Sequence, residues 1–209
     1  ATFFCDITQG VGWYPIHLKK MNIDMAALAA HKFYGPRGVG ALYIKKTNPR
    51  IAIDPILLGG GQENRLRPGT HNVPAIVGLG KACELLQQNG QETYARIRGM
   101  RDHLQKQLFA SIEGIKLNGC SKNQHPANLN ISIPSISGER LKELLPNVMF
   151  STSSACSSTS PKPSHVIPAL GGNDDIIKSS FRLGINKYNT IEEINYVAQK
   201  IIQIVKMYN

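Results

Sequence analysis

Short apolar runs bounded by turn residues predict β-strands near both ends of the chain. In the first fifty residues these runs are 2–5, which leads directly into Asp6, then 23–30 and 40–44. Residues 128–133 alternate strictly between polar and apolar, as a half-buried strand does, and the strand-like run 180–185 contains Arg182. The predicted strands therefore fall into two groups.

Helical periodicity follows the first group. Asn72 can cap a helix that has Pro74 in its first turn and ends at Asn89-Gly90, and a second helix is predicted over 91–110. Its apolar residues form one stripe, with arginine and glutamine opposite: Tyr94, Ile97, Met100, Leu104 and Leu108. Shorter helices are predicted at 138–145, at 164–170 and from 173, and Thr190 with Glu193 predicts a capping box at the start of the last helix.

Length and composition limit the class of protein. The 209 residues are 42% hydrophobic, which allows one large domain or two small ones, and no apolar run is long enough to cross a bilayer. Residues 1–10 lack the basic region of a secretory signal. We expect a cytoplasmic protein with no membrane partner, or one of an organelle matrix. The opening strand has no helix before it, so we expect the chain to begin inside a larger fold.

The net charge of +10 invites a nucleic-acid hypothesis, but the basic residues are scattered and favour a solvated surface. Examples are Lys19-Lys20, Lys45-Lys46, Arg96, Arg98 and Arg101. An acidic protein partner or an anionic cofactor would suit this surface equally. The four cysteines are Cys5, Cys83, Cys120 and Cys156. They are too far apart in sequence for a structural zinc site or a disulfide framework, so at least one of them could be a reactive thiol.

The His31-Lys32 pair follows a buried apolar run and precedes two aromatic residues and a Gly-Pro turn. A strand that ends there presents its last polar side chains at the rim of a sheet. Nearby cations and partial withdrawal from water would favour the neutral amine of Lys32, which can form a Schiff base. The alternative is a rim lysine paired with a carboxylate, so the choice depends on residues elsewhere.

Three other segments contain candidate chemistry. Asp6 places a carboxylate at the end of the first predicted strand. Residues 58–70 combine three consecutive glycines with two arginines and Thr70, which suits a phosphate, although a plain surface loop is an equal alternative. Residues 151–161 are rich in serine and threonine and predict a flexible loop, in which Cys156 is either a reactive thiol or an incidental residue.

Together these residues match pyridoxal-phosphate catalysis with a cysteine nucleophile. The sequence resembles the cysteine desulfurases of the NifS/IscS kind, within the class V aminotransferase family, over essentially its whole length. The resemblance lies in Cys5-Asp6-Ile7-Thr8-Gln9, His31-Lys32-Phe33-Tyr34-Gly35-Pro36-Arg37-Gly38, Gly59-Gly60-Gly61-Gln62-Glu63, Arg67-Pro68-Gly69-Thr70, Ser154-Ala155-Cys156-Ser157 and Ser179-Ser180-Phe181-Arg182.

The resemblance implies pyridoxal 5′-phosphate (PLP) as cofactor. Lys32 would hold it as a Schiff base and shuttle the proton of the substrate α-carbon, while Asp6 would keep the pyridine nitrogen protonated. Gln9 would bond the phenolic oxygen and His31 would help bind the phosphate. Thr70 would reach the phosphate of the neighbouring subunit's cofactor, which implies a homodimer.

The resemblance also implies a reaction and its partners. Arg182 would bind the carboxylate of L-cysteine, a bidentate task that suits a guanidinium. Cys156, as a thiolate, would attack the substrate sulfur, release L-alanine and keep a persulfide. A sulfur-acceptor protein would take this sulfur, either an iron–sulfur scaffold or a relay for tRNA thiolation.

The implied fold class is α/β. Residues 1–81 would be the C-terminal part of a large fold-type I PLP-dependent transferase domain with a mostly parallel sheet. Residues 82–209 would be a smaller α+β C-terminal domain with the cysteine loop.

Two departures from the family pattern matter. Ala29 stands where the family commonly has a phosphate-binding serine, and the family's chain begins well before Ala1, with the main phosphate-binding turn, the ring-stacking group and a substrate-contacting asparagine in that earlier part. We therefore expect the C-terminal part of a desulfurase that is active only with an N-terminal part. The rival hypotheses are a selenocysteine lyase or class V aminotransferase, and a non-catalytic module that binds sulfur-transfer partners.

Overall fold

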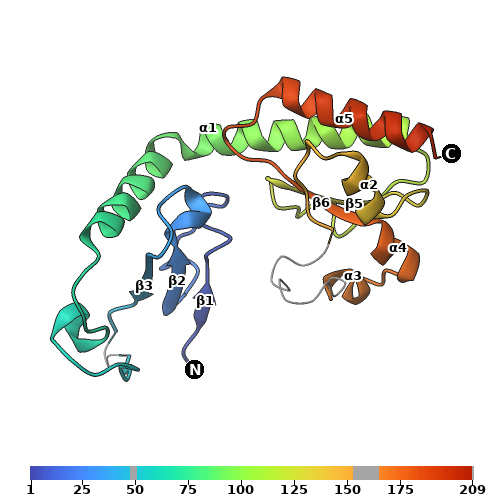
Figure 1. Cartoon of the computed structure of the whole chain (residues 1–209). Helices are drawn as coiled ribbons and strands as arrows, with labels where there is room; N and C mark the ends of the chain where they lie inside the picture. Colours follow the sequence, from blue (N-terminus) through green and yellow to red (C-terminus); the bar gives the residue numbers. More distant parts are fainter. Residues whose placement is uncertain (48–50, 153–164, 209) are drawn as a thin grey trace. The chain divides into compact units, whose positions relative to one another are not determined.

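The computed structural model describes residues 1–47, 51–152 and 165–208 of this α/β protein (Figure 1). The chain forms two compact units, Ala1–Glu92 and Thr93–Asn209, each with its own three-stranded sheet. The domain division at 81/82 stays a prediction.

The sheet of the first unit has the strand order β1-β2-β3. β1 (Phe4–Asp6) and β2 (Met25–Ala29) are parallel, whereas β2 and β3 (Gly40–Ile44) are antiparallel. The predicted strands at these three places are confirmed. A 3-10 helix, η1 (Ala30–Phe33), follows β2 directly, and a second, η2 (Gln62–Arg65), lies in the loop after β3.

One long helix, α1 (Val73–Ser111), stands where two helices were predicted, so the expected break at Asn89-Gly90 is wrong. A glycine inside a helix is only about 1 kcal/mol less favourable than alanine, while a proline is about 3 kcal/mol less favourable. No proline follows Pro74 in this segment, and the Asn89-Gly90 pair lies between good helix formers, Gln87-Gln88 before it and Gln91-Glu92 after it. The predicted apolar stripe is confirmed by the burial of Ile97, Met100, Leu104 and Leu108.

The position of Arg101 corrects a second expectation. The sequence placed it on a solvated basic surface, but its side chain is only 6% exposed. Its guanidinium bonds to Asp102, to the side chain of Gln124 and to the carbonyl of His125. A charge is buried at acceptable free energy only when such partners replace water, and apolar periodicity does not reveal those partners.

The second unit has an antiparallel sheet of β4 (Lys116–Leu117), β5 (Asn128–Ser132) and β6 (Ser180–Gly184) in that order. The short helices are α2 (Gly138–Leu144), α3 (Val166–Ala169) and α4 (Asp174–Ser179), and the long α5 (Ile191–Lys206) runs beside the end of α1 (Figure 1). The predicted capping box is confirmed: Thr190 accepts a bond from the Glu193 amide, and Glu193 accepts one from the Thr190 amide.

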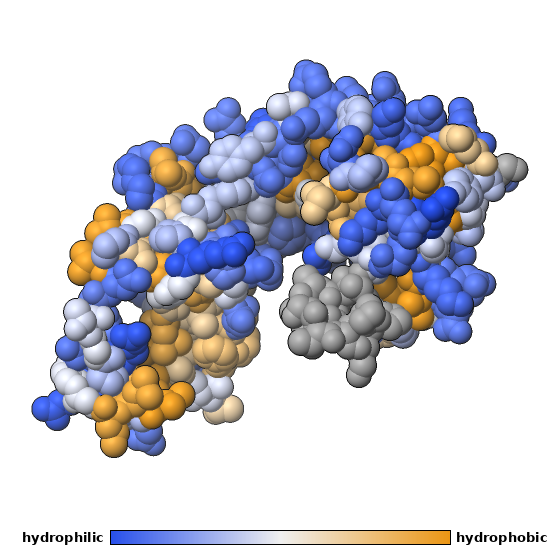
Figure 2. Space-filling view, in the orientation of Figure 1, coloured by the Kyte–Doolittle hydropathy of each residue, from blue (hydrophilic) through white to orange (hydrophobic). Residues whose placement is uncertain are grey.

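The outer surface of α5 is hydrophilic, whereas the loop between β3 and α1 exposes hydrophobic side chains (Figure 2). Figure 2 shows a hydrophilic outer side on α5 and hydrophobic surface over the loop between β3 and α1, where Ile56, Leu57 and Leu58 are exposed. Within the described ranges, none of the helices combines the length and the apolar character needed to span a membrane.

Candidate active site

The parallel pairing of β1 and β2 brings the first group of predicted site residues to one edge of a sheet. Asp6 is the last residue of β1, and His31 and Lys32 belong to η1, immediately after β2. Because the strands are parallel, both chain segments leave the sheet at the same edge. Gln9 lies in the turn that follows β1, so it belongs to the same region.

The conformation of η1 decides which way its side chains face. Ala30 and Phe33 are buried, and Tyr34 ends the helix in the left-handed region with φ of 71°. A side chain at Gly35 would place a Cβ 2.8 Å from the Ala30 Cβ, so only glycine allows this turn to close on the start of η1. The buried pair leaves His31 and Lys32 on the exposed side.

The exposure of Lys32 corrects the expectation that its amine is partly withdrawn from water. In this chain both Lys32 and His31 are exposed, as are Asp6 and Gln9. The reason is that η1 places its apolar residues, not the lysine, against the core. Any dry environment for the amine therefore has to come from a bound group or from further protein.

Hydrogen bonds from Thr8 stabilise the ionised form of the Asp6 side chain. The Thr8 amide donates a hydrogen bond of 2.9 Å to its carboxylate. Bonds from the Thr8 side chain and then from its amide hold the pKa of Asp6 below the usual aspartate value. Asp6 is consequently a carboxylate at neutral pH, which is the form that can pair with a protonated ring nitrogen.

Thr70 lies exposed in the loop between η2 and α1. Internal hydrogen bonds shape this loop: the Gly69 amide donates to the Gln62 side chain at 3.2 Å, and His71 bonds to the carboxylate of Glu63 at 2.9 Å. The 3-10 helix η2, which precedes this loop, contains three consecutive non-glycine residues with positive φ, which is energetically unfavourable: Glu63, Asn64 and Arg65.

The second group of site residues lies on the sheet of the second unit. Arg182 is exposed on β6 between the buried Phe181 and Leu183, as strand alternation requires. Its backbone forms two hydrogen bonds with Ser151, of 3.1 and 2.7 Å. Ser151 begins the serine-rich segment that contains Cys156, which itself lies outside the described residues. The start of the cysteine segment is thus held beside the predicted substrate-binding arginine.

Helix α2 supplies a contact to this segment that the sequence reasoning missed. The Thr152 hydroxyl donates a hydrogen bond to the carboxylate of Glu139, in the first turn of α2. A Cβ at Gly138 would lie 2.7 Å from the Ser180 carbonyl oxygen, so glycine allows the helix to begin this close to β6. The sequence predicted a short helix at 138–145, but nothing in that run indicated the contact with Thr152.

We expect Glu139→Ala to increase hydrogen exchange of the Ser151 amide by about two- to tenfold, since one hydrogen bond of ordinary net strength is lost beside it. The amide exchange is measured by NMR at constant pH. Glu143→Ala is the matched control, because this carboxylate of the same helix bonds to Arg140 instead. Equal exchange in the two variants would show that Glu139 does not hold the segment.

The chain matches the model of the aminotransferase class-V family over residues 1–197, and it therefore belongs to this family. Among its relatives, the cysteine desulfurase IscS of Anaeromyxobacter sp. (strain Fw109-5) and the human cysteine desulfurase are each 40% identical over 204 residues. The alignments cover 98% of this chain but 50% and 44% of those proteins, so the chain spans about half the length of the curated relatives it matches.

Solved structures agree with this assignment. A NifS-like protein has a TM-score of 0.85 and 33% identity, and the match covers 99% of this chain and 53% of that one. A NifS-like protein from Rickettsia africae gives 0.84 and 30%, with coverage of 99% and 54%. The predicted family and the α/β fold of PLP-dependent transferases are confirmed.

PLP is the cofactor of this family. The residues present fit it, because one sheet edge offers an ionised carboxylate, a lysine amine and a histidine. These are the groups that a pyridine nitrogen, an aldehyde and a phosphate require.

Proposed function

We propose that this chain supplies Lys32, Asp6, Arg182 and Cys156 to a cysteine desulfurase that converts L-cysteine to L-alanine. The observation that supports this best is the parallel pairing of β1 and β2, which brings the carboxylate and the lysine to one sheet edge. The 40% identity to cysteine desulfurases is independent support.

Each candidate site residue of the first unit has a proposed role toward the cofactor. When bound, PLP supplies an electron sink for the substrate α-carbon. Asp6 would hold a proton at the ring nitrogen, and Lys32 would be the point of covalent attachment and the base that moves the α-proton. Gln9 would donate to the phenolic oxygen. His31 would bind the phosphate, and Thr70 the phosphate of a second subunit, which makes a homodimer part of the proposal.

The second unit handles the substrate and the sulfur. Arg182 would bind the carboxylate of L-cysteine through two parallel N–H bonds. The thiolate of Cys156 would attack the substrate sulfur: an S–S bond forms, the C–S bond breaks, and the carbon keeps the electron pair and is protonated to give alanine. The resulting persulfide would pass to a sulfur-acceptor protein, either an iron–sulfur scaffold or a relay for tRNA thiolation, in the cytoplasm.

Because the site residues of this chain are exposed, we expect PLP to attach only when further protein covers them. The test is a chimera of this chain with the part of the Anaeromyxobacter desulfurase that it does not cover. After incubation with PLP and borohydride, peptide mapping should find the label on Lys32 in the chimera. In this chain alone, Lys32 should be labelled no more than the exposed Lys20. A strong label on Lys32 in this chain without the added protein would refute the need for further protein to cover the site. A folded chimera that is labelled at another lysine would refute the assignment of Lys32.

Three rival functions share part of this site. A selenocysteine lyase or a class V aminotransferase would also use Asp6 and Lys32, and Cys156 separates these activities from a desulfurase. A non-catalytic module that binds sulfur-transfer partners would leave the chimera without PLP and without alanine formation.

A further inference from the structure

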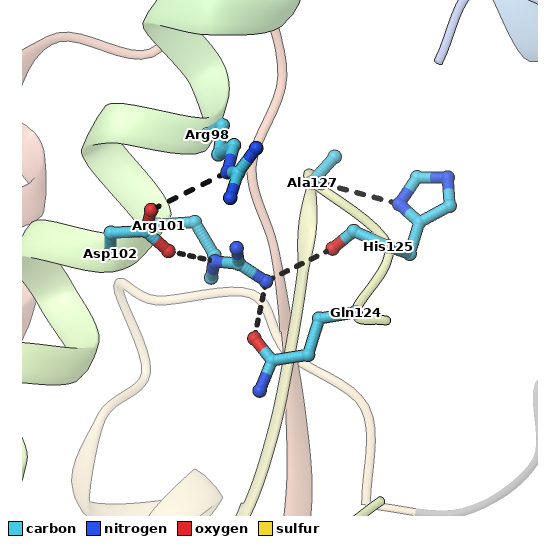
Figure 3. A network of polar contacts seen from close by, with 6 residues as sticks. All are labelled: Arg98, Arg101, Asp102, Gln124, His125 and Ala127. Atoms are coloured by element: carbon cyan, nitrogen blue, oxygen red, sulfur yellow. Dashed lines mark hydrogen bonds and ion pairs between the residues drawn. The ribbon is translucent and has the colours of Figure 1, made fainter. Parts of the chain in front are cut away.

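Arg101 and its neighbours form a polar network in the second unit that the proposed chemistry does not use (Figure 3). The Nε of Arg101 donates to Asp102 at 2.7 Å, and Nη1 donates to the Gln124 side chain and to the His125 carbonyl. Arg98 approaches the other oxygen of the same carboxylate, with its Nε at 3.7 Å. Two guanidinium groups therefore share one carboxylate.

The residues that the structure describes do not use all the donors of Arg101. A guanidinium has five N–H groups, of which those on Nε and Nη1 point to the three acceptors just named. Among the described residues, none accepts a hydrogen bond from Nη2. A nearly buried cation with unused donors favours an anionic oxygen from outside, since the network already holds the guanidinium in place.

An open cleft of about 360 Å³ lies at this point, between the helix α1 and the segment after β4. The cations on its lining are Arg98, Arg101 and Lys106, against the single carboxylate of Asp102. The remaining lining residues are Gln105, Phe109, Ser121 and Gln124. The cleft is thus positively charged, with one aromatic side chain, Phe109, that is 38% exposed.

We propose that this cleft binds an acidic segment of a partner protein, in which a carboxylate side chain lies close to an apolar one. The carboxylate would bond to Arg101 Nη2 and the free nitrogens of Arg98, and Lys106 would attract further acidic residues. The apolar side chain would pack on Phe109. This aromatic wall is the reason to favour a peptide over inorganic phosphate, which has no apolar part to bury.

The test uses the full chain and a short fluorescent peptide in which leucines lie between pairs of glutamates, titrated by anisotropy at low ionic strength. Arg98→Gln and Lys106→Gln should each weaken binding by about two- to fivefold, as expected for exposed charge pairs. Lys178→Gln, on α4, removes an equal charge outside the cleft and should leave binding unchanged. Equal weakening by all three variants would show only non-specific attraction and would overturn the proposal.

A variant that should strengthen peptide binding, rather than weaken it, gives a second test. Asp102→Asn removes the carboxylate that occupies both arginines, so binding of the acidic peptide should tighten by about two- to fivefold. Asp175→Asn, on α4, makes the same change of net charge elsewhere. Equal tightening in both variants would overturn the proposal. Circular dichroism checks that each variant is folded.

Ligand competition identifies what the cleft prefers. Replacing leucine by serine in the peptide, or Phe109 by alanine in the protein, should weaken binding by a similar factor and not further when combined. Complete displacement of the peptide by millimolar phosphate, or tighter binding of a short RNA that depends on Arg98, would contradict the assignment to an acidic protein segment.

Discussion

Lys32→Ala is expected to lower the formation of L-alanine from L-cysteine by at least about a thousandfold in the chimera described above. On the proposed function, the variant would lose both the covalent attachment point for PLP and the base that moves the α-proton, and general acid–base catalysis by one side chain typically contributes a factor of about 10² to 10⁴. Alanine is quantified by mass spectrometry at saturating cysteine, after PLP occupancy has been measured.

Two controls separate this effect from a change of charge or fold. Lys32→Arg keeps the cation but cannot form the covalent link, so it should be as inactive as the alanine variant. Lys20→Ala removes another exposed lysine of the same unit and should keep full activity. Substantial turnover by Lys32→Ala would mean that another amine does the chemistry, and the proposed function would have to be abandoned.

Cys156→Ser is expected to abolish the transfer of sulfur to a thiol acceptor, again by about a thousandfold or more, while PLP occupancy stays unchanged. A serine hydroxyl is not ionised at neutral pH and cannot hold a persulfide, so the variant would lack the nucleophile that the proposed function places at the substrate sulfur. Sulfide released in the presence of a thiol and the persulfide mass on the protein are the two measurements.

Cys83 and Cys120 provide the matched controls, because both are free, exposed cysteines in the described chain. Their serine variants should transfer sulfur normally. If Cys156→Ser still transaminates an amino-acid substrate, and neither it nor the unmodified chimera transfers sulfur, the chain serves a class V aminotransferase. If selenide release from selenocysteine persists while cysteine is not used, it serves a selenocysteine lyase.

Local sequence predicted most elements because their signals act within a few residues. The alternation at β5, the apolar runs at β2 and β3 and the capping box at Thr190 are confirmed. The prediction failed at Asn89-Gly90, where a helix-ending pair is compatible with a continuous helix at a modest cost in free energy. Whether a glycine ends a helix depends on what the next residues pack against, and that information is not local.

The sequence by itself determined the family and the fold class and predicted the types of residue at the candidate site, because the family's motifs are short local runs and PLP chemistry requires these residue types. Only the tertiary structure decided that Asp6 and Lys32 share a sheet edge, that Lys32 is exposed, and that Ser151 pairs with Arg182. It alone also placed Arg101 among buried partners. The physical reason is that exposure and hydrogen-bond partners depend on segments distant in sequence, and a pattern of neighbours does not encode those contacts.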